Sequence, residues 1–163
     1  YGHQHSFHKF ASWHNVVSFA LPRVIANSGY RTSQIGKYHV APEEVYHYET
    51  YIKANSRSPV QMADACREFI KADDEKPFFI YFGTSDPHRG GGKDRNSKSE
   101  LKPDLFGNKQ DKGSYPGIKE EFYKLDEVTI PPFLSDTTET REELAQYYQS
   151  CARIDQGLSL IHI

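Results

Sequence analysis

The chain has 163 residues, of which 37% are hydrophobic, and its mean hydropathy is -0.73. Twenty Lys and Arg residues against 22 Asp and Glu residues give a net charge of -2, which offers no electrostatic basis for binding nucleic acid or an anionic membrane. No apolar run approaches the ~20 residues that a membrane-spanning helix requires.

The first predicted helix covers residues 14–29 (HNVVSFALPRVIANSG) and ends at Gly29. Its apolar side consists of Val16, Val17, Ala20, Val24 and Ile25. Pro22 lies inside this range, so either a new helix begins there or the helix kinks. Residues 30–36 (YRTSQIG) follow as a short predicted strand.

A clear helix start follows at Ser58, the expected N-cap, and Pro59, the expected first helical residue. Apolar residues at helical spacing give this helix one apolar face, formed by Met62, Ala65, Cys66, Phe69 and Ile70. Residues 77–83 (PFFIYFG) are then typical of a strand buried on both faces, as in parallel sheets that are covered by helices.

Residues 90–117 are polar and show little periodicity, and loops of this length are uncommon inside compact domains. We therefore expect the chain to be part of a larger domain. An extended segment at 128–134 (VTIPPFL) leads into a last helix, for which Asp136 and Glu139 form a start similar to a capping box. The expected buried stripe of that helix is Leu144, Tyr147, Cys151 and Ile154.

The final six residues, 158–163 (LSLIHI), break off this helix, and we interpret them as a non-native read-through tail. A genuine short apolar tail is the alternative. We exclude these residues from the fold prediction.

The order helix–strand–helix–strand–helix predicts an α/β layered sheet, in which ligands collect beyond the carboxyl ends of the strands. Lys37 and His39 follow the first strand and are expected to project to one side, with Tyr38 turned away. His88 and Arg89 follow the second strand, in a turn that Pro87 restricts. Each cluster alone is also typical of an ordinary solvated strand end or turn. Together they suit an oxyanion such as a sulfate, sulfamate or phosphate group.

Two further groups of residues could carry chemistry. Cys66 and Cys151 lie on predicted helices among apolar residues, which favours buried free thiols over a disulfide or a nucleophile. Four histidines crowd the start of the chain: His3, His5, His8 and His14. A metal site is conceivable there, but interleaved aromatic residues and the lack of a nearby Cys or carboxylate at ligand spacing favour an aromatic-rich or substrate-facing surface.

Three segments resemble the sulfatase family. GYRTSQIGKYH is similar to the family's second signature, KPFFIYFGTSDPHRG to its later strand and Pro-His turn, and IPPFLSDTTETREELAQYYQSCARIDQG to the segment whose helix ends in Asp-x-Gly. The resemblance runs over residues 5–157. It implies that residues 1–157 are an internal portion of an N-terminal catalytic domain with a three-layer α/β/α, alkaline-phosphatase-like fold.

The resemblance also implies hydrolysis of a sulfated sugar or glycosaminoglycan. GKYHVAPEEVYHYE and DPHR look most similar to family members that remove N-linked sulfate from glucosamine of heparan-type glycans. The alternatives are an O-sulfatase acting on sulfated polysaccharide, or a non-catalytic module that binds anions or glycans. A periplasmic, secreted or lysosomal location is expected from the family.

By resemblance, Lys37 would hold the sulfate and His39 would help to expel it, while His88 would bind sulfate and protonate the leaving nitrogen. Arg89 would support the site. The family uses Ca²⁺ and a formylglycine nucleophile. The Cys/Ser-x-Pro-x-Arg motif that bears this nucleophile and the acidic and Asn residues that bind the metal are absent here. The resemblance therefore implies an inactive portion of an enzyme, with both groups outside it and no metal ligand within it.

Overall fold

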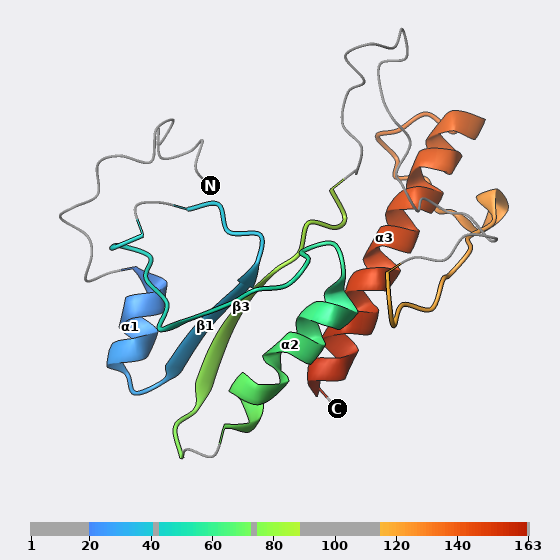
Figure 1. Cartoon of the computed structure of the whole chain (residues 1–163). Helices are drawn as coiled ribbons and strands as arrows, with labels where there is room; N and C mark the ends of the chain where they lie inside the picture. The colour runs from blue at the N-terminus through green and yellow to red at the C-terminus, as the bar shows by residue number, and fades with distance from the viewer. Residues whose placement is uncertain (1–19, 41–42, 73–74, 89–114, 163) are drawn as a thin grey trace, which may run out of the picture. The chain divides into compact units, whose positions relative to one another are not determined.

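The structure is a computed structural model that describes residues 20–40, 43–72, 75–88 and 115–162 (Figure 1). The elements in chain order are α1 (Leu21–Asn27), β1 (Arg31–Gly36), β2 (Thr50–Ile52), α2 (Pro59–Lys71), β3 (Phe78–Gly83), the 3-10 helix η2 (Leu125–Glu127) and α3 (Thr138–His162). The chain divides into two compact units, Tyr1–Lys53 with Cys66–Gly83 and Ala54–Ala65 with Thr84–Ile163, so α2 contributes to both.

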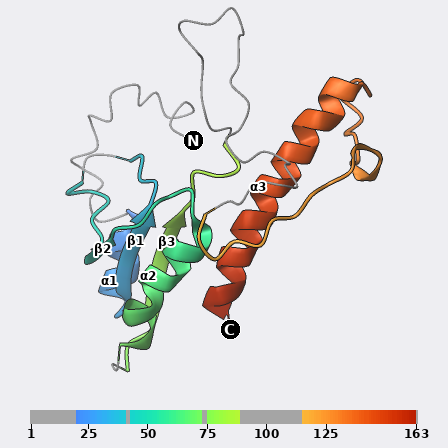
Figure 2. The same ribbon diagram turned by 45° about the vertical axis from the view of Figure 1, so that its right-hand side comes forward.

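The first unit contains a parallel sheet, which in the described residues has the strand order β2-β1-β3 (Figures 1 and 2). The pairing of β1 with β3 runs from Arg31 opposite Phe78 to Gly36 opposite Gly83. Both strands therefore end at the same edge of the sheet. The predicted α/β class with parallel strands is confirmed, whereas β2 was not predicted.

The central strand β1 is buried from Thr32 to Ile35, and a glutamate extends its hydrogen bonding beyond the strand pairing. The Glu49 Oε2 atom accepts hydrogen bonds from the backbone N–H and the Oγ1 of Thr32, at 2.8 and 3.3 Å. The Thr32 Oγ1 in turn accepts a hydrogen bond from the Glu49 N–H at 3.1 Å. The side chain of Glu49 thus satisfies a buried backbone donor just before β1 and β2 begin to pair.

Helices pack on this sheet through aromatic and cationic contacts. α1 contacts β1, and on the part of α2 that belongs to this unit the Phe69 ring lies edge-on to Phe78 at 6.2 Å. The Arg31 guanidinium lies 4.9 Å from the centroid of the Phe69 ring, and its Nη1 donates to the Phe69 carbonyl at 2.5 Å. These contacts fix the end of α2 at the amino edge of the sheet, where β1 and β3 begin.

The structure places the start of α1 at Leu21, with Pro22 in the first turn, which agrees with the alternative of a new helix at this point. Gly29 follows its end with a φ of 90°, a conformation that glycine adopts without strain. The predicted apolar side is only partly correct, because Ala20 is buried while Val24 is 42% exposed. Val16 and Val17 lie outside the described residues.

The prediction that residues 77–83 are buried on both faces is wrong for the described sheet. β3 lies at the edge of that sheet and pairs with β1 alone, and Phe78 and Tyr81 are 39% and 43% exposed. A strand is buried on both faces only where helices cover both sides of its sheet. The apolar run therefore predicted the strand correctly but not how far the strand is buried.

α2 begins at Pro59 as predicted, and Met62 and Cys66 of its apolar face are fully buried. The expected side-chain cap does not form, because the Ser58 hydroxyl is buried without a hydrogen-bond partner in the described part of the chain. The first turn is closed instead by the backbone, where the Met62 N–H donates to the Ser58 carbonyl at 2.9 Å.

The start of α3 differs from the prediction by one residue. Thr137, rather than Asp136, caps the helix, since its Oγ1 accepts a hydrogen bond from the Thr140 N–H at 3.2 Å. Asp136 instead forms a two-pronged ion pair with Arg141, with N–O distances of 2.6 and 2.7 Å. The Arg141 guanidinium lowers the pKa of the Asp136 carboxyl.

The predicted buried stripe of α3 is wrong. Tyr147 is 48% exposed, and the other three residues of that stripe are only half-buried. The buried residues of α3 are Ala145, Gln149, Ser150, Arg153 and Gly157. This face is largely polar, because it contacts the turn at residues 84–88 and the backbone of residues 119–121 through hydrogen bonds.

α3 continues without a break through residues 158–162, so five of the six residues excluded from the fold prediction extend the helix. The interpretation of 158–163 as a non-native tail stays a prediction, as does the assignment of residues 1–157 to one catalytic domain.

Candidate active site

The first candidate cluster follows β1 directly. The Lys37 N–H donates to the Gly83 carbonyl at 2.6 Å, which continues the pairing of β1 with β3 by one residue. Gly36 has a φ of 82°, and the Lys37 carbonyl occupies the space where a Cβ of Gly83 would lie. Both strands therefore need glycine at their ends. β1 needs Gly36 for its positive φ, and β3 needs Gly83 because the Lys37 carbonyl lies so close.

Beyond Gly36 the side chains differ in exposure, while the prediction that Lys37 and His39 project to one side stays a prediction. Lys37 and His39 are exposed, while Tyr38 is half-buried between them. The Tyr38 hydroxyl donates a hydrogen bond to the Tyr46 carbonyl at 2.7 Å, and its ring makes edge contacts with Tyr48, Tyr51 and Tyr81 at 6.1–6.4 Å. The inward tyrosine thus anchors a segment that presents an ammonium and an imidazole to solvent.

Burial keeps this tyrosine cluster neutral. Desolvation is the largest cause that raises the pKa of Tyr38, and neighbouring hydroxyls raise it further. Desolvation also raises the pKa of Tyr48 to about 12, with help from Tyr81 and Tyr51. The Tyr38 hydroxyl therefore stays protonated, and acts as a hydrogen-bond donor, at any physiological pH.

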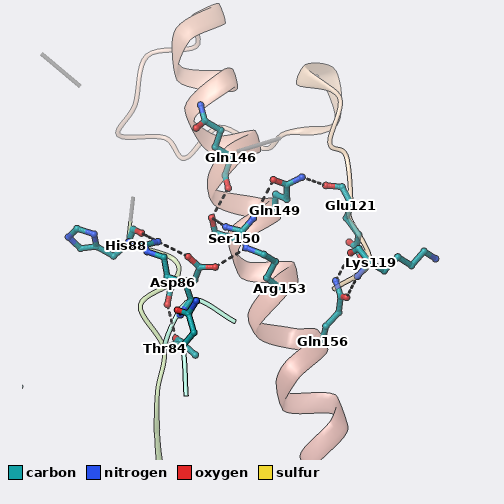
Figure 3. A network of polar contacts seen from close by, with 12 residues as sticks. Thr84, Asp86, His88, Lys119, Glu121, Gln146, Gln149, Ser150, Arg153 and Gln156 are labelled. Carbon is teal, nitrogen blue, oxygen red and sulfur yellow. Dashed lines mark hydrogen bonds and ion pairs between the residues drawn. The ribbon is translucent and has the colours of Figure 1, made fainter. Parts of the chain in front are cut away.

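The second candidate cluster, the turn at residues 84–88 that we call the His88 turn, belongs to the second unit. The Thr84 Oγ1 donates to the Asp86 carbonyl at 2.7 Å, and the His88 N–H donates to the Ser85 carbonyl at 3.0 Å. The Asp86–Pro87 peptide bond is cis. Figure 3 shows the imidazole of His88 pointing away from α3, whereas the Asp86 carboxylate points toward it.

Two arginines hold the carboxylate of this turn from different elements. Arg57, just before α2, lies with its Nη1 3.0 Å from the Asp86 Oδ1 and also donates to the His88 carbonyl at 3.0 Å. Arg153, on α3, lies with its Nε 2.8 Å from the Asp86 Oδ2. The sequence analysis did not identify either arginine. Nothing in the local sequence marks either arginine as buried or paired, since most arginines are solvated.

The structure brings some of the predicted site residues together and leaves the relation of others open. Lys37 and His39 lie on one segment at the edge of the sheet, and His88 lies in the other compact unit. Arg89 and the histidines at positions 3, 5, 8 and 14 lie outside the described residues. A common pocket for Lys37, His39 and His88 therefore stays a prediction.

The described residues do not fit either of the expected cofactors. Among residues 20–40, 43–72, 75–88 and 115–162, no group of three or more His, Cys, Asp or Glu side chains could hold a metal ion. Cys66 is fully buried, and desolvation raises the pKa of its thiol to about 11, so it is protonated and inert as a nucleophile. Both cysteines are free thiols as predicted, although Cys151 is only half-buried.

None of the helices in the described ranges has the length and apolar content that crossing a bilayer would require.

Comparisons with known proteins agree with the resemblance of the three segments. The family model of the sulfatases matches residues 11–161. N-sulphoglucosamine sulphohydrolase of Homo sapiens is 33% identical over 171 residues, which cover 99% of this chain and 33% of the human protein. The chain therefore spans about a third of the length of this curated relative. Because the family model matches most of its length, the chain belongs to the sulfatase family.

Proposed function

We propose that the protein containing this chain is a sulfohydrolase that removes N-linked sulfate from glucosamine of heparan-type glycans. The observation that carries the proposal is the segment after β1, where Lys37 and His39 are exposed at the carboxyl edge of a parallel sheet in a sulfatase-family chain. The similarity to a protein named for N-sulphoglucosamine supports the choice of an N-sulfate over an O-sulfate.

The fold proposed for the complete catalytic domain is the three-layer α/β/α arrangement of the alkaline-phosphatase-like proteins. The parallel strands β2-β1-β3 are consistent with a part of its central sheet. In such sheets, substrates bind beyond the carboxyl ends of the strands, which is where the chain carries Lys37 and where β3 leads toward His88.

Each proposed role follows from the chemistry of the side chain. Lys37 has no side-chain partner in the described part of the chain, so its ammonium can bind the negative oxygens of a sulfate as a point charge. A sulfamate nitrogen leaves readily only when it is protonated, and His88 supplies that proton as the S–N bond breaks and its electron pair goes to nitrogen. His39 accepts a proton at a later step, when sulfate is expelled.

Overall, the reaction consumes one water and one sulfamate, and yields a protonated amine and a sulfate dianion. Calcium and formylglycine are proposed for the complete protein on the basis of the family alone. Among the residues that the structure describes, no group of three or more His, Cys, Asp or Glu side chains could hold a metal ion, and the Cys66 thiol is fully buried.

The test is sulfate release by the complete protein from N-sulfated glucosamine and from O-sulfated sugars. The substitution His88→Ala should lower kcat on the N-sulfated sugar by ~10²–10⁴-fold, the usual contribution of a positioned acid. His47→Ala, which removes an exposed histidine from the segment before β2, is the matched control and should leave kcat unchanged.

Three results would change the proposal. Undiminished turnover by the His88→Ala protein would remove the role given to His88. Release of sulfate from O-sulfated sugars alone would identify an O-sulfatase. Binding of sulfated glycans without any turnover would indicate a non-catalytic module.

A further inference from the structure

The ion pair of Asp86 with Arg153 is unusual for its burial. Their side chains are 1% and 2% exposed, and the two residues lie 67 positions apart in the chain. Removing two charges from water is costly, and well-packed apolar residues often stabilise a protein as much as a buried ion pair does. A gain in stability is therefore a weak explanation for this ion pair, and a role in orienting nearby groups is the alternative.

The ion pair fixes the His88 turn, because Asp86 lies two residues before His88. The same Arg57 Nη1 contacts the Asp86 Oδ1 and the His88 carbonyl, both at 3.0 Å. A displacement of the carboxylate therefore disturbs the contact that holds the backbone of His88. A further hydrogen bond, 2.6 Å between the hydroxyls of Ser56 and Ser85, ties the turn to the segment that carries Arg57.

Arg153 is itself held in one orientation (Figure 3). Its Nη2 donates to the Ser150 Oγ at 3.0 Å, and that hydroxyl donates to the Gln146 carbonyl at 3.0 Å. Its Nη1 lies 3.4 Å from the Gln149 Oε1, while the Gln149 Nε2 donates to the Glu121 carbonyl at 2.9 Å. The planar guanidinium thus connects Asp86 to a set of oriented groups on α3, which the single ammonium of a lysine could not do.

We propose that Arg153 is a positioning residue for the reaction: through Asp86 it sets the orientation of the His88 turn and thereby the transfer of a proton from His88 to the leaving nitrogen. This inference rests on the proposed function, since it requires His88 to act as the acid. Arg57 contacts the other oxygen of the same carboxylate and has the same role. Arg153 itself touches no substrate.

A positioning role predicts a specific pattern of kinetic coupling. If Arg153 acts only through the imidazole of His88, its loss should matter while His88 is present and should have little effect once His88 has been replaced by alanine. A residue that merely maintains the fold would cost the same in both backgrounds. A double-mutant cycle on kcat separates these cases.

The experiment uses the complete protein, with N-sulfated glucosamine as the substrate and sulfate release as the readout. Arg153→Gln should lower kcat by roughly 10²-fold, which is part of the contribution of a general acid, and Arg153→Lys by less. In the His88→Ala background, Arg153→Gln should lower kcat by less than about threefold. KM should change less than kcat, because Lys37, which binds the sulfate in the proposed function, is not altered. Arg141→Lys, which alters an exposed ion pair on the same helix, is the control.

If the Arg153 variants do not fold, Arg57→Lys provides the second test, because the Arg57 side chain is 27% exposed and lysine keeps a positive charge beside Asp86. The same selective loss is expected from it. An equal loss of kcat with and without His88, or no loss at all, would overturn the proposal. In either case the wild type would still release sulfate and His88→Ala would still impair it. A wild type that releases no sulfate would instead contradict the proposed function itself.

Discussion

Replacement of Gly157 by alanine tests how closely α3 approaches the start of α2. Gly157 is buried within α3, and a Cβ built on it would lie 2.5 Å from the carbonyl carbon and the Cβ of Pro59, and 2.6 Å from the Pro59 oxygen. On helix propensity alone, alanine in a helix interior is about 1 kcal/mol more favourable than glycine. The sequence and the structure therefore predict effects of opposite sign.

The magnitude follows from the contact distances. Carbon atoms pack best at about 3.5–4.0 Å, so the added methyl would lie ~1 Å too close to atoms of Pro59. Two of the three nearest atoms belong to the backbone at the first residue of α2, which cannot turn away as a side chain can. Overpacking of this kind costs about 1–3 kcal/mol, and we place this site in the upper half of that range. After the gain of about 1 kcal/mol in propensity, the net loss in the free energy of unfolding is about 1–2 kcal/mol.

Thermal unfolding of the complete protein measures this loss. The entropy of unfolding grows with chain length, so in a complete protein about three times as long as this chain 1 kcal/mol corresponds to only ~1 °C in Tm, and Gly157→Ala should lower Tm by about 1–2 °C. Glu142→Ala, at an exposed position near the start of α3, is the control and should leave Tm nearly unchanged. If Gly157→Ala raised Tm, the close approach of Gly157 to Pro59 would be refuted.

Three further predictions concern other parts of the chain. Glu49→Ala should destabilise the protein by about 1–3 kcal/mol, measured by chemical unfolding, because the buried Thr32 N–H loses its acceptor. An unchanged denaturant midpoint would refute this role of Glu49. Folding raises the pKa of Cys66 from 9.0 to about 11, so the contribution of this thiol to the free energy of unfolding is complete below pH 9 and is lost as pH rises toward 11, by roughly 2–3 kcal/mol. Cys66→Ala should flatten this alkaline decline in stability, and an unaltered pH profile of stability would contradict the prediction. Lys37→Ala should weaken inhibition by inorganic sulfate about tenfold or more, and equal inhibition of both proteins would exclude an anion-binding role.

Elements with local signals could be predicted from the sequence. The start of α2 follows from a proline at the first helical position, and the end of α1 from a glycine that adopts a positive φ. β1 and β3 follow from short runs that end in Gly36 and Gly83. The exposure of Lys37 and His39 around an inward Tyr38 follows from the alternation of extended backbone.

Elements that depend on distant residues could not be predicted in this way. β2 has only three residues and no distinctive pattern, and it exists because β1 offers it a parallel edge. The side-chain contribution of Glu49 to β1 depends on a contact over 17 residues. The exposure of β3 depends on which strands lie beside it, and a run of apolar residues contains no information about that.

α3 shows the limit most clearly, because hydrophobic periodicity assumes that the buried face of a helix is apolar. α3 buries Gln149 and Arg153 instead, and a helix can bury such residues only when other segments supply their hydrogen-bond partners. Those segments are the backbone near Glu121 and the carboxylate of Asp86, neither of which is visible from the helix sequence. Two segments that resemble sulfatases separately, DPHR and ARIDQG, are thus joined in the structure by one ion pair. If Arg153 in one segment orients His88 in the other, a single ion pair accounts for both resemblances. The kinetic coupling between Arg153 and His88 therefore tests whether the fold of this chain serves its chemistry.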